Sequence, residues 1–260
     1  MSGETDPTRV VYSLEGADVL PFLQGIVSND VLRLDKGPGL VWAALLTPQG
    51  KYLADFLIAR PQAGGPVLLD IHRDLAAATL RRLAMYRLRA DVKITPTDLA
   101  VTRGLDTPPA DEPSAGALPD PRHPALGWRA YGAPGTAPQI DWDAIRVAHV
   151  IPESLRELIP DDSYLLASAF ERLHGVDFRK GCYVGQEVTA RMKHKTELKK
   201  GLARVTIQGD AGFGAEITAD GKPAGTLFTR SGDRAIAYLR FDRAGGEMRA
   251  GEAILHRDDI

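Results

Sequence analysis

The sequence contains one cysteine, Cys182, among its 260 residues. A single cysteine excludes an internal disulfide, and it excludes a metal or cluster site built from several cysteines of one chain. The sequence also lacks an apolar run near the ~20 residues that a membrane-spanning helix needs. Residues 1–9 are polar and show neither the basic start nor the apolar stretch of a signal peptide. These absences predict a cytoplasmic protein without a membrane anchor.

Neither sign of charge dominates, because 32 Lys and Arg stand against 34 Asp and Glu, for a net charge of −2. The chain as a whole is therefore not drawn to nucleic acid or to anionic membranes. Common cofactor and metal motifs are missing as well: there is no Gly-x-Gly-x-x-Gly segment, no phosphate-binding loop, and no pair of histidines at ligand spacing. These gaps argue against a dinucleotide-binding enzyme and against a metal site.

Apolar spacing predicts strands interleaved with helices over the first 150 residues. A hairpin is expected around residues 47–51, and the small polar residues 28–30 are expected to form a turn after a helix. This order favours an α+β fold, with helices packed on a mostly antiparallel sheet. We predict strands at 10–14, 40–46, 52–60, 67–71, 92–94 and 99–102, and helices at 16–26, 74–88 and 141–150.

Two changes of pattern divide the chain. Residues 106–138 are rich in proline and predict a long surface connection, broken by a strand at 128–131. After Lys200 apolar residues alternate with polar ones and glycines are frequent, which favours a small β-barrel or sandwich. The predicted domains are therefore residues 1–196 and 197–260.

The most chemically suggestive stretch runs from Phe178 to Glu187 and contains Cys182. Glycines at 181 and 185 allow tight turns or close approach to other backbone, and a helix is expected from Gly185 onward. A helix N-terminus and a nearby cation such as Lys180 both favour a thiolate over a thiol. The alternative is a buried cysteine that acts as a small hydrophobe. The sequence leaves both possibilities open.

Basic residues gather after this motif, seven between residues 179 and 200 against two acids. Such a patch can bind an anionic ligand, for example a polyanionic cofactor tail or RNA. It can equally be the solvated face of a helix. No aromatic residues alternate with these charges as stacking on RNA bases would require. The basic residues are Arg179, Lys180, Arg191, Lys193, Lys195, Lys199 and Lys200.

The segment 180–187, with Arg191 four residues on, resembles the signature of the YgfZ/GcvT-like folate-binding family. It is most similar to the branch that contains the mitochondrial iron–sulfur assembly factor. Four further segments carry the resemblance, at residues 22–30, 46–55, 151–153 and 175–178.

This resemblance implies a GcvT-like α+β fold, with two folate-binding lobes around a central channel and a C-terminal β-barrel. It implies tetrahydrofolate as a ligand and a role in assembling or repairing four-iron clusters, with radical tRNA-modifying enzymes among the clients. Cys182 and Lys180 would be the functional residues, with Cys182 a transient cluster ligand or a sulfur or redox relay. Other assembly proteins and the client enzymes would be the partners. The expected folate contacts are Asn29, Asp55, Arg146, Tyr183, Gln186, Glu187 and Arg191.

The sequence also departs from the aminomethyltransferases that share this fold. Those enzymes carry paired acids where this chain has Ala54 and Asp55, and a pterin-binding glutamate where it has Ala148. They also lack the cysteine. The resemblance therefore favours an assembly factor over a turnover enzyme. The alternative is a tetrahydrofolate-dependent one-carbon transferase that uses Asp55 as base and Asn29 to orient the cofactor.

Overall fold

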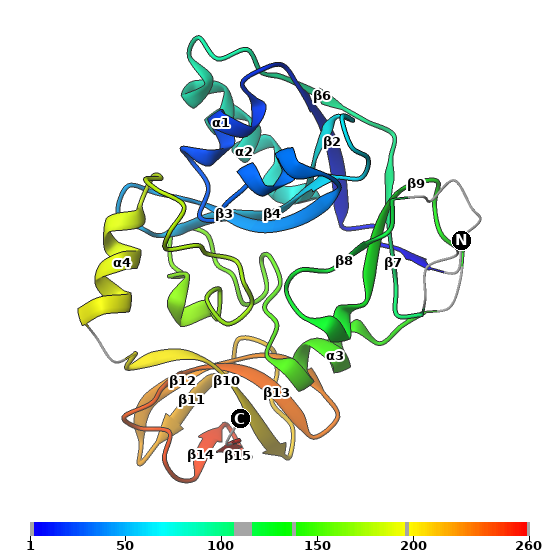
Figure 1. The fold of residues 1–260 in the computed structure, drawn as a ribbon. Coiled ribbons are helices and arrows are strands. Elements are labelled where there is room, and N and C mark those ends of the chain that lie inside the picture. Colours follow the sequence, from blue (N-terminus) through cyan, green and yellow to red (C-terminus); the bar gives the residue numbers. More distant parts are fainter. Residues whose placement is uncertain (1–2, 107–115, 137–138, 196–197, 259–260) are drawn as a thin grey trace. The chain divides into compact units, whose positions relative to one another are not determined.

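The computed structural model describes residues 3–106, 116–136, 139–195 and 198–258 (Figure 1). The chain divides into two compact units, which are treated separately below. The first consists of residues 1–140 and 173–186, and the second of residues 141–172 and 187–260. None of the helices among the described residues is both long and apolar enough to cross a membrane.

The first unit is built on a five-stranded antiparallel sheet with strand order β3-β4-β5-β2-β6. Helix α2 (Arg73–Arg87) packs on it through buried Leu75, Thr79 and Leu83, which recur every four residues and so share one face. Figure 1 shows α2 on the same side of the sheet as the short helix α1 (Val19–Gln24). The strands are β2 (Arg9–Glu15), β3 (Gly39–Leu46), β4 (Tyr52–Arg60), β5 (Val67–His72) and β6 (Lys93–Pro96).

A second sheet in the same unit has the order β1-β7-β9-β8. Its strands are β1 (Glu4–Thr5), β7 (Ala100–Gly104), β8 (Leu118–Pro119) and β9 (Trp128–Gly132). The strand predicted at 128–131 is thus confirmed, whereas β1 and β8 were not predicted because two residues show no period. Parts of the predicted proline-rich connection, residues 107–115 and 137–138, lie outside the described residues.

Buried ion pairs join the two sheets of this unit. Asp70 of β5 binds Arg9 of β2 at 2.5 Å and Arg129 of β9 at 3.1 Å, so one carboxylate contacts both sheets. Arg129 also binds Asp120 at 3.0 Å, and Arg122 binds the same carboxylate at 2.8 Å. Burial alone would raise the pKa of Asp120, but the two arginines outweigh it and hold the pKa well below its usual range. These groups are charged inside the protein because they have partners.

The second unit contains a closed barrel with strand order β10-β13-β12-β11-β14-β15. Ala235, Ala237 and Leu239 of β13 face its core, as their alternation predicts. Ile236 points the other way and packs against Val147 of helix α3 (Trp142–His149). The strands are β10 (Lys200–Gln208), β11 (Glu216–Ala219), β12 (Lys222–Ser231), β13 (Arg234–Arg240), β14 (Met248–Ala250) and β15 (Ala253–Arg257).

The predicted boundary between residues 196 and 197 lies outside the described residues. Helix α3, together with the loops to residue 172, belongs to the same compact unit as the barrel. The local sequence pattern around residues 141–150 predicts the helix, but it does not indicate that the helix packs against the barrel.

We expect Arg129→Met to lower the free energy of unfolding by about 3–5 kcal/mol, because it leaves the buried Asp70 and Asp120 carboxylates short of a cation. Urea unfolding at neutral pH measures the change. Arg81→Met, at an exposed position of α2, is the control and should change stability by less than about 0.5 kcal/mol. Equal stability of the two variants would show that the network does not hold the sheets together.

Candidate functional site

Cys182 lies on a loop that precedes helix α4 (Gln186–Lys195), and its side chain is exposed. The sequence left open whether this residue is a reactive thiol or part of the core. Its exposure rules out the buried, inert cysteine. The thiol is therefore available to a reagent, a metal or a partner protein.

Two glycines shape this loop, as predicted. Gly181 and Gly185 have φ angles of +95° and +83°, which residues with side chains rarely adopt. A Cβ atom on Gly185 would lie 2.4 Å from the carbonyl oxygen of Thr47 and 2.9 Å from the Leu46 side chain. The cysteine loop thus lies directly on the β3–β4 turn. Two sequence segments that carry the family resemblance meet at this contact, although Thr47 and Gly185 are 138 residues apart in the chain.

Lys180 fastens the same loop to the end of helix α1. Its Nζ donates hydrogen bonds to the carbonyl oxygens of Gln24 and Val27, the latter at 2.8 Å. In return, the Gln24 side-chain amide donates to the Lys180 carbonyl at 3.1 Å. A cation is favourable at this end of a helix, where carbonyl groups lack partners. Nζ also lies 4.9 Å from the ring centroid of Tyr183, a cation–π contact.

Burial lowers the pKa of Lys180 from 10.5 to about 8, although the nearby Asp30, Asp177 and Cys182 act in the opposite direction. At neutral pH the side chain therefore still carries its charge. The loop around Cys182 contains a fixed positive charge, and this charge favours an anionic ligand beside it.

Asn29 links the segment before the cysteine loop to strand β3. Its Nδ2 donates to the carbonyl oxygens of Trp42 and His174, at 2.7 Å and 2.6 Å. Its Oδ1 accepts from the backbone of Asp30 and from Arg33. The side chain is buried and its amide is fully used inside the protein. It lies near the loop, but as part of its support.

Asp55, predicted as a folate contact and as the base of the alternative transferase, is also engaged. Its side chain is buried, and its two oxygens accept hydrogen bonds from Tyr52 Oη at 2.7 Å and Trp42 Nε1 at 2.8 Å. A base must have a free lone pair directed at its substrate. These bonds tie the carboxylate to β3 and β4, and its predicted parts as a folate contact and as a base stay predictions.

Arg146 belongs to the second unit and to its core. Its guanidinium binds Asp143 at 2.8 Å, the carbonyl oxygen of Ile151 at 3.1 Å, and the buried carboxylate of Glu157. Glu157 also accepts a hydrogen bond from Thr229 of the barrel. Arg146 thus joins α3, the following loop and the barrel. Its predicted part in folate binding stays a prediction.

The remaining predicted residues surround the start of α4. Gln186 accepts a hydrogen bond from the Tyr183 backbone at 3.0 Å through its Oε1 atom, which closes the turn before the helix. Glu187 and Arg191 form an exposed ion pair of 3.1 Å one turn apart on α4. Tyr183 is buried.

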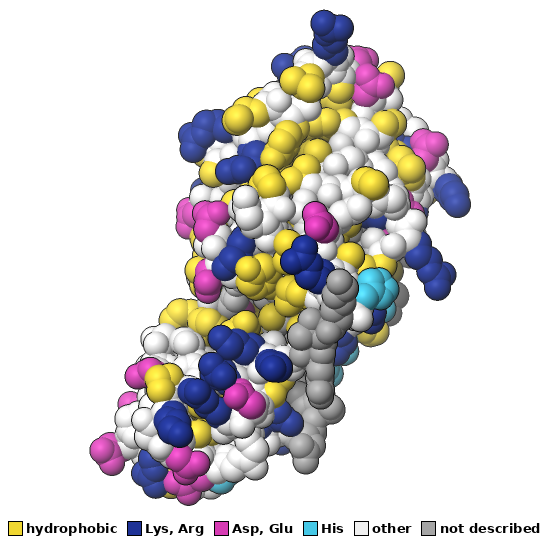
Figure 2. Space-filling view, turned by 90° about the vertical axis from the view of Figure 1, so that its left-hand side faces the viewer, with side chains coloured by type: hydrophobic (Ala, Val, Ile, Leu, Met, Phe, Trp, Pro, Cys, Tyr) yellow, Lys and Arg dark blue, Asp and Glu magenta, His cyan; other side chains and the backbone are white. Residues whose placement is uncertain are grey.

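The basic patch predicted from residue 179 onward is partly neutralised. Lys180 is turned toward carbonyl groups, Arg191 is paired with Glu187, and Lys193 is paired with Glu171. Figure 2 shows one face of the molecule, on which Lys and Arg side chains are interspersed with Asp and Glu. Three of the seven basic residues are thus engaged by other groups of the protein.

Sequence analysis missed the part played by Ser28. Its hydroxyl donates to the carbonyl oxygen of Gly175 at 2.6 Å and accepts from the backbone of Ala44 at 2.9 Å. Ser28 thus joins β3 to the chain leading into the cysteine loop. Residues 28–30 are three polar residues after an apolar helix, and this pattern could have indicated a buried hydrogen-bonding role as well as the predicted turn.

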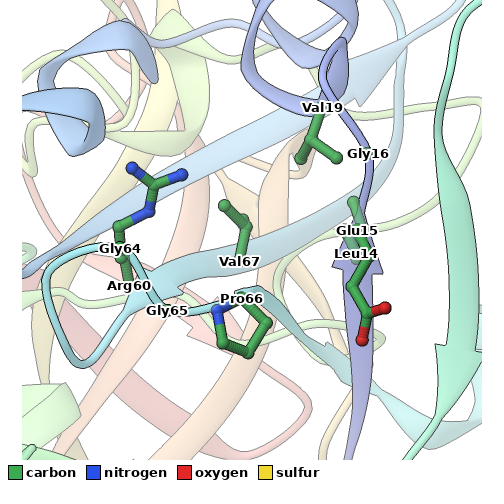
Figure 3. A pocket seen from close by; sticks show the side chains of 9 residues that line it. All are labelled: Leu14, Glu15, Gly16, Val19, Arg60, Gly64, Gly65, Pro66 and Val67. Carbon is green, nitrogen blue, oxygen red and sulfur yellow. The ribbon is translucent and has the colours of Figure 1, made fainter.

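A cavity of about 330 Å³ lies elsewhere in the first unit, at the ends of β2 and β4 and the start of β5. Figure 3 shows the Arg60 guanidinium and the Glu15 carboxylate on opposite sides of it. None of the predicted site residues lines this cavity. Its lining consists of Leu14, Glu15, Gly16, Val19, Arg60, Gly64, Gly65, Pro66 and Val67.

Comparison with known proteins places these features in context. Residues 199–257 match the family described as the CAF17 C-terminal β-barrel domain. A protein of Mycosarcoma maydis named "Iron-sulfur cluster assembly factor IBA57 homolog, mitochondrial" is 35% identical over 77% of this chain. The mouse and human proteins of the corresponding name are 28% and 29% identical over 92% of it. The chain spans 56% of the fungal relative and 78% of the mammalian ones.

The fold has a solved neighbour in the glycine cleavage system aminomethyltransferase T from Bartonella henselae, with a TM-score of 0.76 and 14% identity. The match covers 98% of this chain and 84% of that one. The predicted GcvT-like α+β fold with a C-terminal β-barrel is thus confirmed.

The relatives also correct one prediction. They are named as mitochondrial proteins, which contradicts the cytoplasmic location expected from the sequence. That expectation depended on the lack of a signal peptide and of a spanning helix. Neither feature distinguishes the cytoplasm from the interior of an organelle.

We expect Lys180 to make the wild type gain stability as pH rises from about 8 to 10.5. Its pKa is about 8 in the folded protein and returns to 10.5 on unfolding, so between these values the unfolded chain binds more protons. Raising the pH then favours the folded state. Urea unfolding across this range should show the rise in the wild type and not in Lys180→Met or Lys180→Arg. The same pH dependence in all three proteins would contradict this account.

Proposed function

We propose that this chain is an accessory factor for the assembly or repair of iron–sulfur proteins and acts through Cys182. The observation that carries the proposal is the exposed thiol on a loop fixed by Lys180, Gln24 and Gly185. The relatives named as iron–sulfur cluster assembly factors support the same conclusion. The aminomethyltransferase fold supplies the scaffold, and the cysteine supplies the chemistry.

In this role the Cys182 thiolate binds one iron of a cluster that is the cargo, replacing a thiol ligand of the donor. The exchange forms one iron–sulfur bond and breaks another, and the displaced thiolate leaves with its own electron pair, so no oxidant or reductant is required. One thiolate cannot hold a cluster alone, so a second protein or a small thiol must supply the other ligands. The protein would therefore hold a cluster only while a partner shares it.

The surroundings of the thiol suit such a handover. Clusters with thiolate ligands are anionic, and Lys180 places a fixed cation in the same loop. Its hydrogen bonds to α1 and the contact of Gly185 with the β3–β4 turn leave the loop little freedom. A ligand held in one position loses less entropy when it binds. The loop is preorganised for a brief, specific contact.

A more specific part of the proposal concerns the client proteins that would receive the cluster. The likeness of residues 180–187 to the YgfZ signature supports four-iron proteins as clients, including radical enzymes that modify tRNA. The partners would then be iron–sulfur assembly proteins and these client enzymes.

Tetrahydrofolate is a further part of the proposal, supported by the sequence resemblance and by the GcvT-like fold. The side chains expected to hold it do not fit that task as they stand, because Asn29, Asp55 and Arg146 are bonded within the protein. We therefore assign no chemical step to folate. Tetrahydrofolate should raise the melting temperature if it binds the folded chain. An unchanged melting temperature at saturating ligand would remove folate from the proposal.

The alternative of a one-carbon transferase has less support. It needs a carboxylate base, and Asp55 is buried with both oxygens accepting hydrogen bonds. It also needs an acid for the pterin, and Ala148 stands at the equivalent position. The solved neighbour supports the fold alone.

Complementation tests the role of the thiol. In a strain that lacks its own family member, the wild-type chain should restore the activity of a four-iron enzyme. Cys182→Ala and Cys182→Ser should leave that activity at the level of the deletion strain, because neither side chain can bind iron as a thiolate does. Both variants should fold, because the side chain is exposed and its loss creates no cavity.

The control is His194→Ala, an exposed change on α4 that should rescue as well as the wild type. Full rescue by Cys182→Ser would refute the thiol mechanism but keep the pathway. Lack of rescue by the wild type, at normal expression, would refute the proposed function itself.

A further inference from the structure

The cavity of about 330 Å³ in the first unit lies over a row of side chains on one face of the five-stranded sheet. Leu14 of β2 pairs with Val67 of β5. Since Ala59 of β4 pairs with Leu68, the next residue, Arg60, extends this row. Side chains of one row share a face of the sheet, and Figure 3 shows Val67 between Arg60 and Leu14.

The floor and one wall of this cavity are apolar and fixed. Leu14 and Val67 form the floor, Val19 of helix α1 forms the wall, and all three side chains are buried in the packed part of the unit. The volume lies at the lower end of the roughly 300–1,000 Å³ that small-molecule sites occupy. A ligand of this cavity is therefore small and partly apolar.

Arg60, at one end of the floor, is incompletely bonded by the protein. Its side chain is 16% exposed, and its Nη1 donates to the carbonyl oxygen of Leu34 at 3.0 Å. Its Nε is buried and has no hydrogen-bond partner among the described residues. The carboxylate of Asp35 lies 3.6 Å from Nη1, but that side chain is 81% exposed, so solvent screens the attraction.

Two other buried arginines show the bonding that a structural role requires. Arg129 binds carboxylates through Nε and Nη1, and Arg146 binds acceptors through Nε, Nη1 and Nη2. Arg60 has no buried carboxylate of this kind among the described residues. A largely buried group with an unused donor indicates an additional partner, such as a water, an ion or a ligand.

Glu15, the other charged residue of the lining, does not neutralise Arg60. It follows Leu14 in β2, so its side chain belongs to the opposite face of the sheet. On that face its carboxylate accepts a hydrogen bond from the Ser13 hydroxyl at 3.2 Å, and Lys93 stands opposite it on β6. Arg60 is thus the charged side chain on the cavity's face of the sheet.

Two further acids lie next to Gly16, which lines the cavity. Asp18 accepts a hydrogen bond from the backbone of Asp91 at 2.8 Å, and the Asp91 carboxylate accepts one from the backbone of Ala17 at 3.1 Å. Neither acid lines the cavity. Their charges still disfavour a ligand with a second anionic group at this rim.

We propose that this cavity binds a small monocarboxylate with a short apolar chain. The carboxylate would pair with the Arg60 guanidinium, whose planar fork matches it, and the chain would lie on Leu14 and Val67 against Val19. A phosphate dianion is a poorer match, because one arginine supplies half of the charge it needs and acids stand at the rim. The inference goes beyond cluster assembly and does not depend on Cys182.

Hexanoate is the probe for this site. Hexylamine and hexanol have the same chain with another head group, and acetate has the head group without the chain. Methyl NMR spectra of the full chain should show hexanoate shifting the signals of Leu14, Val19 and Val67. Each of the other three compounds should bind about tenfold more weakly or less, because each lacks the charge or the apolar contact.

Variants test the part played by the arginine. Arg60→Met should weaken hexanoate binding by about tenfold or more and remove the preference over hexanol, while Arg60→Lys should keep part of the affinity. The melting temperature of Arg60→Met should stay close to that of the wild type, because the change removes one carbonyl bond and a screened ion pair. Arg81→Met, at an exposed position of α2, and Cys182→Ala should both bind hexanoate as the wild type does.

Three results would overturn the proposal. The first is binding of hexanol or hexylamine as tight as that of hexanoate, and the second is unchanged hexanoate affinity in Arg60→Met. The third is a set of methyl shifts confined to Leu80 and Ile94, which line a different groove. If Arg60→Met does not fold, the order of the four affinities and the shifted methyl groups still decide, because both are measured on the wild type.

Discussion

A lysine ammonium group bound to carbonyl oxygens at the end of α1 fixes the loop that presents Cys182. The contact uses three physical effects at once. It supplies donors to carbonyls that the helix leaves without partners, it places a cation at the negative end of the helix dipole, and it keeps a positive charge beside the thiol. Burial lowers the pKa of Lys180, so the contact also costs solvation energy. A scaffold that bears this cost to hold an exposed cysteine in place is consistent with the transient metal contact proposed for Cys182.

Two of the charged residues predicted to contact folate are hydrogen-bonded within the framework. Asp55 bonds Trp42 and Tyr52 within the sheet, and Arg146 bonds Glu157 in the second unit. Each of these buried groups is satisfied by the protein itself, which is why it can remain charged or polar inside. A group that is already satisfied gains little from a ligand.

Local patterns in the sequence predicted most regular elements and few of the long-range contacts. The strand at 52–60 was found from its apolar run and the helix near 74–88 from its 3.6-residue period, because both patterns are set within a few residues. The pairing of Arg9 with Asp70 and of Asp70 with Arg129 spans about 60 residues in each case, and no local period marks it. The motif around Cys182 singled out this loop, but its packing against residues 24–27 and 47 and the exposure of the thiol are seen only in the structure.

The positions of charged residues in the sequence also fail to predict their partners in the fold. The number of basic residues predicted a positive patch at 179–200. In the structure, however, Arg191 and Lys193 have acidic partners and Lys180 faces carbonyl oxygens. Among the arginines of α2, Arg87 lines a groove beside strand β6 and donates a hydrogen bond to the carbonyl oxygen of Val92. A count of charges ignores their partners, and partners are decided by the fold.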